Sequence, residues 1–441
     1  MLLACVLVAA VSVPLASALS YDAWGWLLWG RELAGGLPFT TAGYPSWKPL
    51  TGLIAIPLAP LGDAAPYLWL FMMRASAAVA LLLAFRLGRR AAGPWAGVLA
   101  AVAPLLVPGW LVQAGVGGSE PLLTMLLLAA LDRQLAGDDR GGLALAFLAA
   151  LLRPESWPLL GVAGVVAWRR RPGLRPWVAA ALVAVPALWF GGDYLGSGSP
   201  FTGGHLARVS KQATEIQHAG GFPSLVVLGR ALELLPPLIL AGLPVALVSG
   251  VRRRDPLLLA LCGGALVWTA EVAAMSVLGY AGIGRFLFPA AAAAAVAGAA
   301  GLLIVVRLSP GAMRAPLIAL MLVAILGSGT ESVSGTGREV SMVEHRADLD
   351  QSLSAIMAKV RLQAVRERGH LSTQGIEATA LAWRLGVIAR SVRHTHVPGV
   401  ALELRHVPWL SLDRRVARHH LVVRALAHDA QLSLLSLRRR E

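Results

Sequence analysis

Charged side chains interrupt the apolar stretches of this sequence at a few defined places. The stretch AFLAALLRPESWPLLGVAG, residues 146–164, carries Arg153 and Glu155 in its middle. A charge inside a membrane core is costly, so it is normally paired, hidden from lipid or used in function. Arg153 and Glu155 are close enough along the chain to pair with each other or to bind one ligand together. A structural Arg–Glu pair between broken helices is the alternative to a ligand site.

Two further acids stand at the ends of apolar segments. Asp22 follows the first apolar run in LSYDAWGWLLWGREL, and Glu120 opens another in VGGSEPLLTMLLL. Asp22 could simply be solvated, and Glu120 could simply stabilise the positive end of a helix dipole. All of these charged groups could instead reach one outward-facing cavity if the segment around Arg153 opens outward. Ligand binding would then explain them together.

Basic side chains in the connecting loops are candidates for contacting a polar or anionic group. Lys48 lies in the first long loop, His205 and Lys211 lie in the second, and Arg285 begins the apolar run GRFLFP. Long loops between spans are often binding loops or lids. The alternative for His205 and Lys211 is simple solvation. For Arg285 the alternative is a stem that runs along lipid with its charge at the membrane surface.

The composition indicates an all-α, polytopic membrane protein. Of the 441 residues, 56% are hydrophobic and only 14% are charged, whereas soluble domains contain about 25% charged residues. The net charge of +15 sits largely in short loops, so it sets membrane orientation and does not indicate nucleic-acid binding. We expect about 10–11 transmembrane helices, within the ranges 2–19, 66–86, 93–113, 120–136, 141–168, 176–191, 224–249, 256–279, 285–306 and 313–329.

The segment 141–168 is too long and too broken for one simple span. Pro154 disfavours a helical conformation at Arg153, so two short helices meeting there are expected. Trp24, Trp26, Trp29 and Trp47 follow the first span, and we interpret them as an interfacial aromatic belt on an amphipathic helix.

Lysine and arginine counts orient the protein in the membrane. One set of short loops carries fourteen such residues and the opposite set five, so the first set is assigned to the cytosol. Residues 1–329 then form the transmembrane domain. Residues 330–441 form a small extracytoplasmic C-terminal domain of the α/β class, because DLDQSLSAIMAKVRLQAVRERG has helical periodicity and GVALELRHV alternates like a strand.

The ordered set of motifs resembles the integral-membrane GT-C glycosyltransferases. The motifs are YDAWGWLLWGREL with PSWKPL, then GGSEPLLTMLLLAAL, LAALLRPESWPLL, DYLGSGSPFTGGHLARVSK and GIGRFLFP. The set is closest to mannosyl- and arabinosyltransferases that use polyprenyl-phosphate sugars. The resemblance covers about residues 1–330 and rests on the order of the motifs, since no single one is diagnostic.

The resemblance implies roles for several residues. Asp22 matches the catalytic acid of the first outer loop, Arg153 a cation near the lipid phosphate, and Arg285 the outer-loop arginine before an apolar span. Glu155 could orient Arg153 or bind sugar hydroxyls, and Glu120, Lys48, His205 and Lys211 are expected to contact substrate. Many relatives have paired acids where this chain has Asp22 followed by Ala23, so no cofactor is expected, and a divalent metal is possible but unsupported.

The function expected from these features is inverting transfer of a hexose or pentose at the outer face of the cytoplasmic membrane. The partners would be a polyprenyl-phosphate-linked sugar donor, a glycan or glycolipid acceptor of the cell envelope, and membrane lipids. A transporter or lipid flippase is the alternative, because broken helices and intramembrane charges also occur there. A non-catalytic assembly protein, whose outer tail binds cell-wall partners, is the third possibility.

Overall fold

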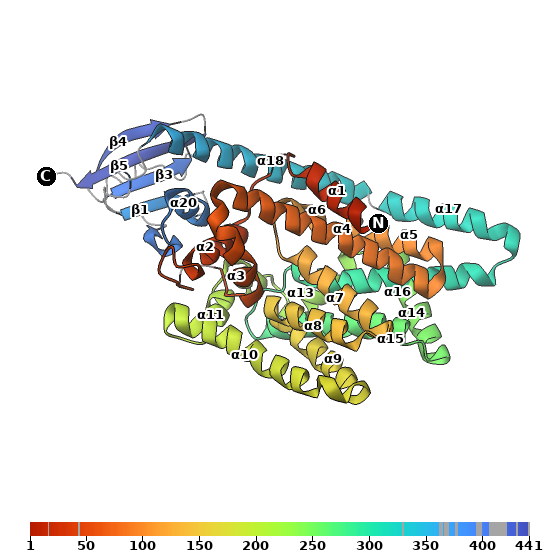
Figure 1. Cartoon of the computed structure of the whole chain (residues 1–441). Coiled ribbons are helices and arrows are strands. Elements are labelled where there is room, and N and C mark those ends of the chain that lie inside the picture. Colours follow the sequence, from red (N-terminus) through yellow and green to blue (C-terminus); the bar gives the residue numbers. More distant parts are fainter. Residues whose placement is uncertain are drawn as a thin grey trace.

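The protein is a bundle of helices with a small β-sheet at one end (Figure 1). The computed structural model describes residues 1–15, 17–42, 45–328, 330–360, 365, 370–374, 378–393, 399–404, 421–428 and 431–439. The α-helices are α1 (Leu2–Ser12), α2 (Tyr21–Leu33), α3 (Pro49–Ala55), α4 (Ala65–Ala92), α5 (Pro94–Val102), α6 (Trp110–Gly115), α7 (Glu120–Leu135), α8 (Asp139–Leu152), α9 (Trp157–Arg170), α10 (Arg175–Ser197), α11 (Thr202–Arg208), α12 (Lys211–Gln217), α13 (Pro223–Glu233), α14 (Pro237–Arg253), α15 (Pro256–Val277), α16 (Phe288–Leu308), α17 (Gly311–Ser328), α18 (Thr330–Lys359) and α20 (Ala378–Leu385).

Several helices are long and apolar enough to cross a membrane, as a multi-pass membrane protein requires. By length and composition they lie in Pro49–Ala92, Pro172–Ser197, Pro256–Val277 and Gly284–Leu308, and the pair α13 and α14, bent by 101°, would add a fifth. Other predicted spans are shorter apolar helices, such as Leu2–Ser12 and Pro94–Leu106. The expected 10–11 spans therefore do not all correspond to single long helices, because proline and glycine interrupt the apolar runs.

The predicted break around Arg153 is confirmed. Helix α8 ends at Leu152, Arg153 is extended with φ −149° and ψ 137°, and a short 3₁₀ turn, η3 (Pro154–Ser156), leads into α9. The proline ring excludes the helical conformation from the preceding residue. The chain therefore turns at Arg153 and presents its side chain, with that of Glu155, at the joint between two helices.

Helix α16 is the core of the bundle, and almost all of its residues are buried. Its sequence FPAAAAAAVAGAAG consists almost entirely of small residues. A Cβ atom on Gly298 would collide with the carbonyl oxygen of Ile239 in α14, and one on Gly242 would collide with that of Gly298. Small residues thus let the two backbones approach closely, which is how helices commonly pack inside membranes.

The four tryptophans in and near the first long loop are not an interfacial belt, so that prediction is wrong. Trp24, Trp26, Trp29 and Trp47 are each no more than 6% exposed. The Nε1 of Trp29 donates to the carbonyl oxygen of Thr40 at 3.1 Å, and that of Trp47 donates to Leu188 at 3.0 Å. Helix α2 and the following loop are therefore a packed core unit, held by aromatic burial and satisfied indole donors.

The C-terminal region contains a five-stranded sheet in the order β2-β1-β3-β5-β4. The strands are β1 (His370–Gln374), β2 (Val392–Arg393), β3 (Gly399–Leu404), β4 (Leu421–His428) and β5 (Leu432–Arg439). Strand β1 runs parallel to β2 and β3, whereas β5 runs antiparallel to β3 and β4. The α/β class predicted here is confirmed, with β3 in the alternating segment GVALELRHV and α18 covering part of the predicted helical segment.

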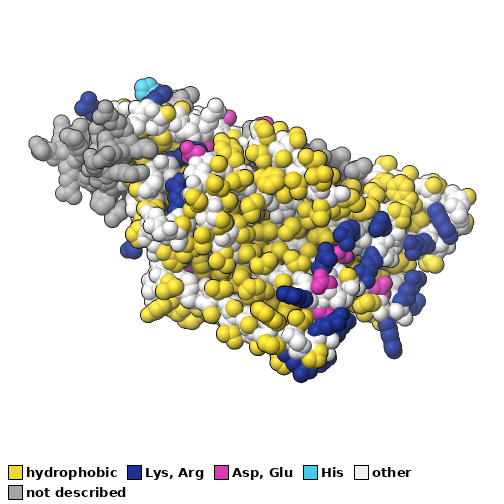
Figure 2. All heavy atoms as spheres, viewed as in Figure 1, with side chains coloured by type: hydrophobic (Ala, Val, Ile, Leu, Met, Phe, Trp, Pro, Cys, Tyr) yellow, Lys and Arg dark blue, Asp and Glu magenta, His cyan; other side chains and the backbone are white. Residues whose placement is uncertain are grey.

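The arginine-rich turns share one end of the molecule. The turns that join α4 to α5, α9 to α10 and α14 to α15 lie at the end away from the sheet (Figure 1). Lysine and arginine side chains gather over that end in Figure 2, beside a broad hydrophobic surface along the helices. These three arginine-rich turns, which the charge count assigns to the same side of the membrane, thus lie at the same end of the structure.

Candidate active site

Asp22 lies in the first turn of α2, and two hydrogen bonds of Ser20 hold the start of this helix in place. The Oγ of Ser20 accepts from the backbone N–H of Ala23 at 3.3 Å and caps the helix. The backbone N–H of Ser20 donates to the carbonyl oxygen of Val116 at 2.9 Å. Asp22 is therefore held at a helix N-terminus, where the dipole favours its negative charge.

Lys48 approaches the same place from the residue that precedes α3. Its Nζ donates to the Oγ of Ser119 at 3.1 Å and lies 4.8 Å from the centre of the Trp26 ring. Burial lowers the pKa of Lys48 from 10.5 to about 8, and the positive charge of Arg153 adds to this effect. Lys48 is thus a cation that loses its proton at only mildly alkaline pH.

Glu120 bridges two guanidinium groups at the start of α7. Its side chain is 2% exposed, and its Oε1 lies 3.6 Å from Nη2 of Arg153 and 3.7 Å from Nε of Arg285. Stabilisation of the helix dipole alone does not account for this placement. A buried carboxylate needs charged partners, and the two arginines provide them.

Arg153 and Glu155 form the buried floor of this cluster. The Nη1 of Arg153 donates to Oε1 of Glu155 at 3.0 Å, and each side chain is 6% exposed. The guanidinium also lies 3.7 Å from the centre of the Phe286 ring. Three buried atoms here lack a hydrogen-bond partner among the described residues, namely Nε of Arg153, Oε2 of Glu155 and Oγ of Ser156. Unpaired buried polar atoms are rare, so their concentration marks a place where a polar ligand would fit.

Arg285 and Asp22 form the accessible rim of the cluster. The Nη2 of Arg285 donates to Oδ2 of Asp22 at 3.3 Å, and the two side chains are 26% and 24% exposed. Arg285 lies in the short 3₁₀ turn η5 (Gly284–Leu287) that leads into α16. It is therefore not an isolated arginine with its charge at the membrane surface. It joins Asp22 to Glu120, and its guanidinium is partly open to the outside of the structure.

The six residues Asp22, Lys48, Glu120, Arg153, Glu155 and Arg285 define what we call the charge cluster. They come from the starts of α2, α3 and α7, the break between α8 and α9, and the turn before α16. Three carboxylates thus face three cations, and all of them stand at helix ends. A bound phosphate would find two guanidinium groups and an ammonium group within one small region.

His205 and Lys211 are placed differently. His205 is exposed on α11. Lys211 is 87% exposed and pairs with Glu215 at 3.8 Å along α12. No contact of either side chain with the charge cluster is found in the described part of the chain. Their expected role in substrate binding stays a prediction.

Three residues near the cluster have no role in the sequence-based prediction. Ser119 and Phe286 are direct neighbours of Glu120 and Arg285 in the chain, so their motifs could have drawn attention to them. Glu271, on α15, is close enough to Glu155 for the two carboxylates to repel each other, and its buried Oε2 has no hydrogen-bond partner among the described residues. An acid inside a predicted span was the available signal for Glu271.

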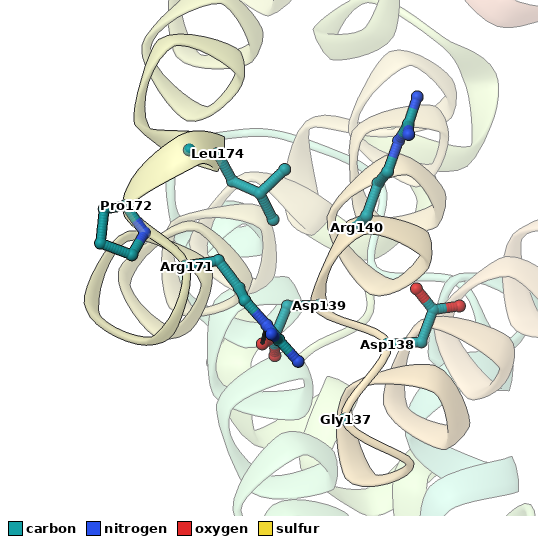
Figure 3. A pocket seen from close by; sticks show the side chains of 8 residues that line it. Gly137, Asp138, Asp139, Arg140, Arg171, Pro172 and Leu174 are labelled. Carbon is teal, nitrogen blue, oxygen red and sulfur yellow. Dashed lines mark ion pairs between the residues drawn. The ribbon is translucent and has the colours of Figure 1, made fainter.

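A pocket of about 410 Å³ lies at the opposite end of α8 (Figure 3). Asp139 begins α8, and its side chain, 2% exposed, lies 3.6 Å from Arg170 and 3.5 Å from Arg171. Arg153 follows the other end of the same helix. Asp139 and Arg171, which both line this pocket, are therefore already paired with each other, and the pocket is separate from the charge cluster.

The residues that the structure describes do not fit a metal site. Among the described residues, no group of three or more His, Cys, Asp and Glu side chains could hold an ion. In the charge cluster, Asp22, Glu120 and Glu155 are each paired with a guanidinium. Carboxylates in such pairs would have to exchange a cationic partner before they could bind a metal.

Comparison with solved structures identifies the fold. ArnT from Cupriavidus metallidurans, solved with undecaprenyl phosphate, superposes with a TM-score of 0.61 at 15% identity, over 99% of this chain and 97% of that one. This chain has the GT-C fold. The oligosaccharyltransferase AglB from Archaeoglobus fulgidus, solved with an inhibitory peptide and a dolichol-phosphate, gives 0.51 at 13% identity, over 91% and 69% of the two chains.

Comparison of the sequence alone gives no assignment. No family model matches the chain, and no curated protein matches it in sequence. At 13–15% identity the solved structures show the GT-C fold, as the order of the motifs predicted. A shared fold does not by itself give a shared activity, so function has to be argued from the charge cluster.

Proposed function

We propose that this protein is a membrane glycosyltransferase that moves a sugar from a polyprenyl-phosphate donor to a cell-envelope acceptor. The observation that carries the proposal is the charge cluster itself, in which Asp22 at the rim and Arg153 in the floor are linked through Arg285 and Glu120. ArnT binds undecaprenyl phosphate and AglB binds a dolichol-phosphate in their solved structures. A lipid phosphate is also the kind of ligand that the cations of the cluster would bind.

The proposed reaction is one displacement with inversion at the anomeric carbon. The acceptor hydroxyl oxygen attacks that carbon and its proton passes to the carboxylate of Asp22. The bond between the carbon and the phosphate oxygen breaks, and its electron pair stays on the leaving phosphate. A positioned general base contributes typically about 10²–10⁴-fold to such a step. Arg285, 3.3 Å from Asp22, holds this carboxylate beside the cations of the cluster.

The cations of the cluster stabilise the charge that develops on the phosphate. Arg153 has a planar group able to bind two phosphate oxygens, and Lys48 adds a compact charge. Their burial excludes water, which strengthens their interaction with the leaving group. Glu155 orients Arg153 through Oε1, while its unpaired Oε2 is free to accept a hydrogen bond from a sugar hydroxyl. The proposed donors are hexosyl or pentosyl lipids, and the proposed acceptors are glycans or glycolipids.

The proposed orientation puts the charge cluster and the C-terminal domain on the outer side of the cytoplasmic membrane. The arginine-rich turns lie at the end of the bundle away from the sheet, and arginine-rich loops remain in the cytosol. The cluster lies at the helix ends remote from these turns, since Asp139 and Arg153 flank α8. Clustering of the acids at one side, away from the middle of the membrane, supports an enzyme over a transporter with a site at the midplane.

The experiment is transfer by purified protein from a panel of radiolabelled polyprenyl-phosphate sugars to membrane-extracted acceptors. We expect wild-type protein to transfer label from at least one donor, and Asp22→Asn to lower the rate by at least about 100-fold. Glu215→Gln is the matched control, because Glu215 is an acid, 61% exposed, whose ion-pair partner among the described residues is Lys211. It should keep full activity.

Two outcomes would contradict the proposal. If Asp22→Asn is folded and transfers label at the wild-type rate, Asp22 is not the base. If no donor in the panel yields a labelled acceptor while labelled lipid crosses reconstituted vesicles, the protein is a transporter or flippase. A chelator should leave transfer unchanged, because the carboxylates of the cluster are paired with arginines.

A further inference from the structure

Helix α20 of the C-terminal region packs directly on the helix that carries Asp22. Figure 1 shows α20 beside α2, although about 350 residues separate them in the sequence. Almost every side chain of α20 is buried, from Ala378 to Leu385. The sequence gives no reason to expect this contact. It links the C-terminal region to the charge cluster through a single short helix.

One hydrogen bond reaches the residue next to Asp22. The Oγ1 of Thr379 donates to the backbone carbonyl oxygen of Tyr21 at 3.0 Å. On the other side, the N–H of Ser20 donates to the carbonyl oxygen of Val116. The first turn of α2 is thus held between α20 and the end of α6. Both attachments are within two residues of the proposed base.

A second set of contacts fixes the rotation of α2. The rings of Trp24 and Trp383 lie 5.8 Å apart. Arg31 donates from Nη1 to the carbonyl oxygen of Trp383 at 2.9 Å and covers the ring of the same residue at 3.1 Å from its centre. Cation–π and aromatic contacts in a desolvated place contribute to stability and are sensitive to geometry. They prevent α2 from turning and moving Asp22 away from Arg285.

Helix α20 is itself anchored within the C-terminal region. The Nη2 of Arg384 donates to Oδ2 of Asp350, on α18, at 2.9 Å. Helix α20 also contacts η6 (Ala389–Ser391) and β2 at the edge of the sheet. The C-terminal domain and the membrane helices therefore together fix the position of α2.

We propose that the C-terminal domain takes part in the reaction through α20, with Thr379 as a positioning residue for Asp22. The inference rests on the proposed function, since it gives Asp22 the role of base. General-base catalysis depends on hydrogen-bond geometry between base and acceptor. A misplacement of about 1 Å can lower a rate by about 100-fold. The contact therefore controls turnover more than donor binding, which the buried cations provide.

The experiment compares Thr379→Val, which removes the hydroxyl at constant volume, with Thr379→Ser, which restores it. We expect Thr379→Val to lower kcat by about tenfold without changing KM for the donor, and Thr379→Ser to recover most of the loss. Ser372→Ala is the matched control. Ser372 is also buried in the C-terminal domain, and its Oγ also donates to a backbone carbonyl, that of Val400 at 3.3 Å, which belongs to β3 and not to α2.

A double-mutant cycle separates positioning from a general structural effect. If Thr379 acts through Asp22, the variant Asp22→Asn/Thr379→Val should have the same residual rate as Asp22→Asn alone. An equal tenfold loss in both backgrounds would overturn the inference. So would a folded Thr379→Val protein with the wild-type kcat. If Thr379→Val does not fold, Arg31→Gln tests the same contact between α2 and α20 and should also lower kcat about tenfold, with a wild-type kcat overturning the inference.

Failure of the inference differs from failure of the proposed function. Wild-type transfer by Asp22→Asn would remove the base and with it both proposals. A large loss in Asp22→Asn together with unchanged kcat in folded Thr379→Val and Arg31→Gln would leave the glycosyltransferase in place and exclude the positioning role of α20. Melting temperatures in detergent establish that each variant is folded.

Discussion

Lys48 should make donor recognition depend on pH in the mildly alkaline range. Its pKa of about 8 follows first from burial and then from the neighbouring charge of Arg153. A phosphodiester donor keeps one negative charge over this pH range, so any change in donor binding must come from the titration of groups on the protein. The protonated fraction of a group with this pKa falls about tenfold between pH 7 and pH 9. If the neutral amine binds phosphate poorly, kcat/KM should fall by up to the same factor.

A single substitution tests whether deprotonation of Lys48 causes the fall in kcat/KM. Lys48→Arg keeps a positive charge at every accessible pH, because arginine is not deprotonated in proteins. Its kcat/KM for the donor should therefore stay level from pH 7 to pH 9, whatever its absolute value. The kcat of the wild type should fall at higher pH than kcat/KM, since bound phosphate stabilises the protonated lysine.

The assay is initial-rate transfer of label at donor concentrations well below KM, in buffers of constant ionic strength. A wild-type profile that is flat to pH 9 would refute the reasoning, as would an equal decline in Lys48→Arg. Folding stability should change in the opposite direction to activity. The unfolded chain binds more protons than the folded one between pH 8 and 10.5, so stability without donor should rise through that window.

Three further predictions concern the floor of the cluster and the packing around it. Arg153→Lys should keep the fold but lower kcat/KM by about 100-fold, because an ammonium cannot reproduce the planar guanidinium. Arg153→Met should lower kcat/KM and, in addition, lower the free energy of unfolding by about 3–5 kcal/mol, because it leaves the neighbouring carboxylates unpaired. Trp24→Ala should cost about 3–5 kcal/mol in denaturant unfolding, whereas Trp95→Ala, at a residue 48% exposed, should cost under about 0.5 kcal/mol. Gly30→Ala should destabilise by about 1–3 kcal/mol, because its Cβ would meet the backbone of α3, while Gly161→Ala, with open space around it, should stabilise slightly.

The break at Arg153 is predictable because it depends on local rules. A proline sets the conformation of the residue before it, whatever the surroundings, and apolar runs set the approximate positions of the membrane helices. The overall fold also follows from the order of the motifs. These features need no knowledge of which helices are neighbours.

The pairing within the charge cluster is not predictable in the same way. Asp22 and Arg285 are 263 residues apart, and only the tertiary fold brings them together. The residue types indicated that each is unusual in its segment, but not which partner each one has. For Glu120 the local signal even favoured another explanation, because an acid at a helix start is common.

The tryptophans show why a residue type can mislead. Tryptophan suits both a membrane interface and a protein core, because its large ring is apolar and its N–H needs only one partner. In this protein Trp29 and Trp47 find those partners in backbone carbonyls that the chain supplies later. The same limit applies to α20, whose contact with α2 has no counterpart in the local sequence of either helix.

The shortness of α8 and α9 places the charge cluster at a definite depth. Each helix has 14 residues and so rises about 21 Å, less than the hydrocarbon thickness of about 30 Å. If the arginine-bearing turns at the other ends of α8 and α9 lie at one boundary of the hydrocarbon layer, Arg153 lies about 10 Å from the opposite boundary. Either the bilayer thins beside this joint, or the charge cluster lies in a recess below the level of the surrounding headgroups. In both cases the proposed acceptor would have to reach below the headgroup level of the more distant bilayer.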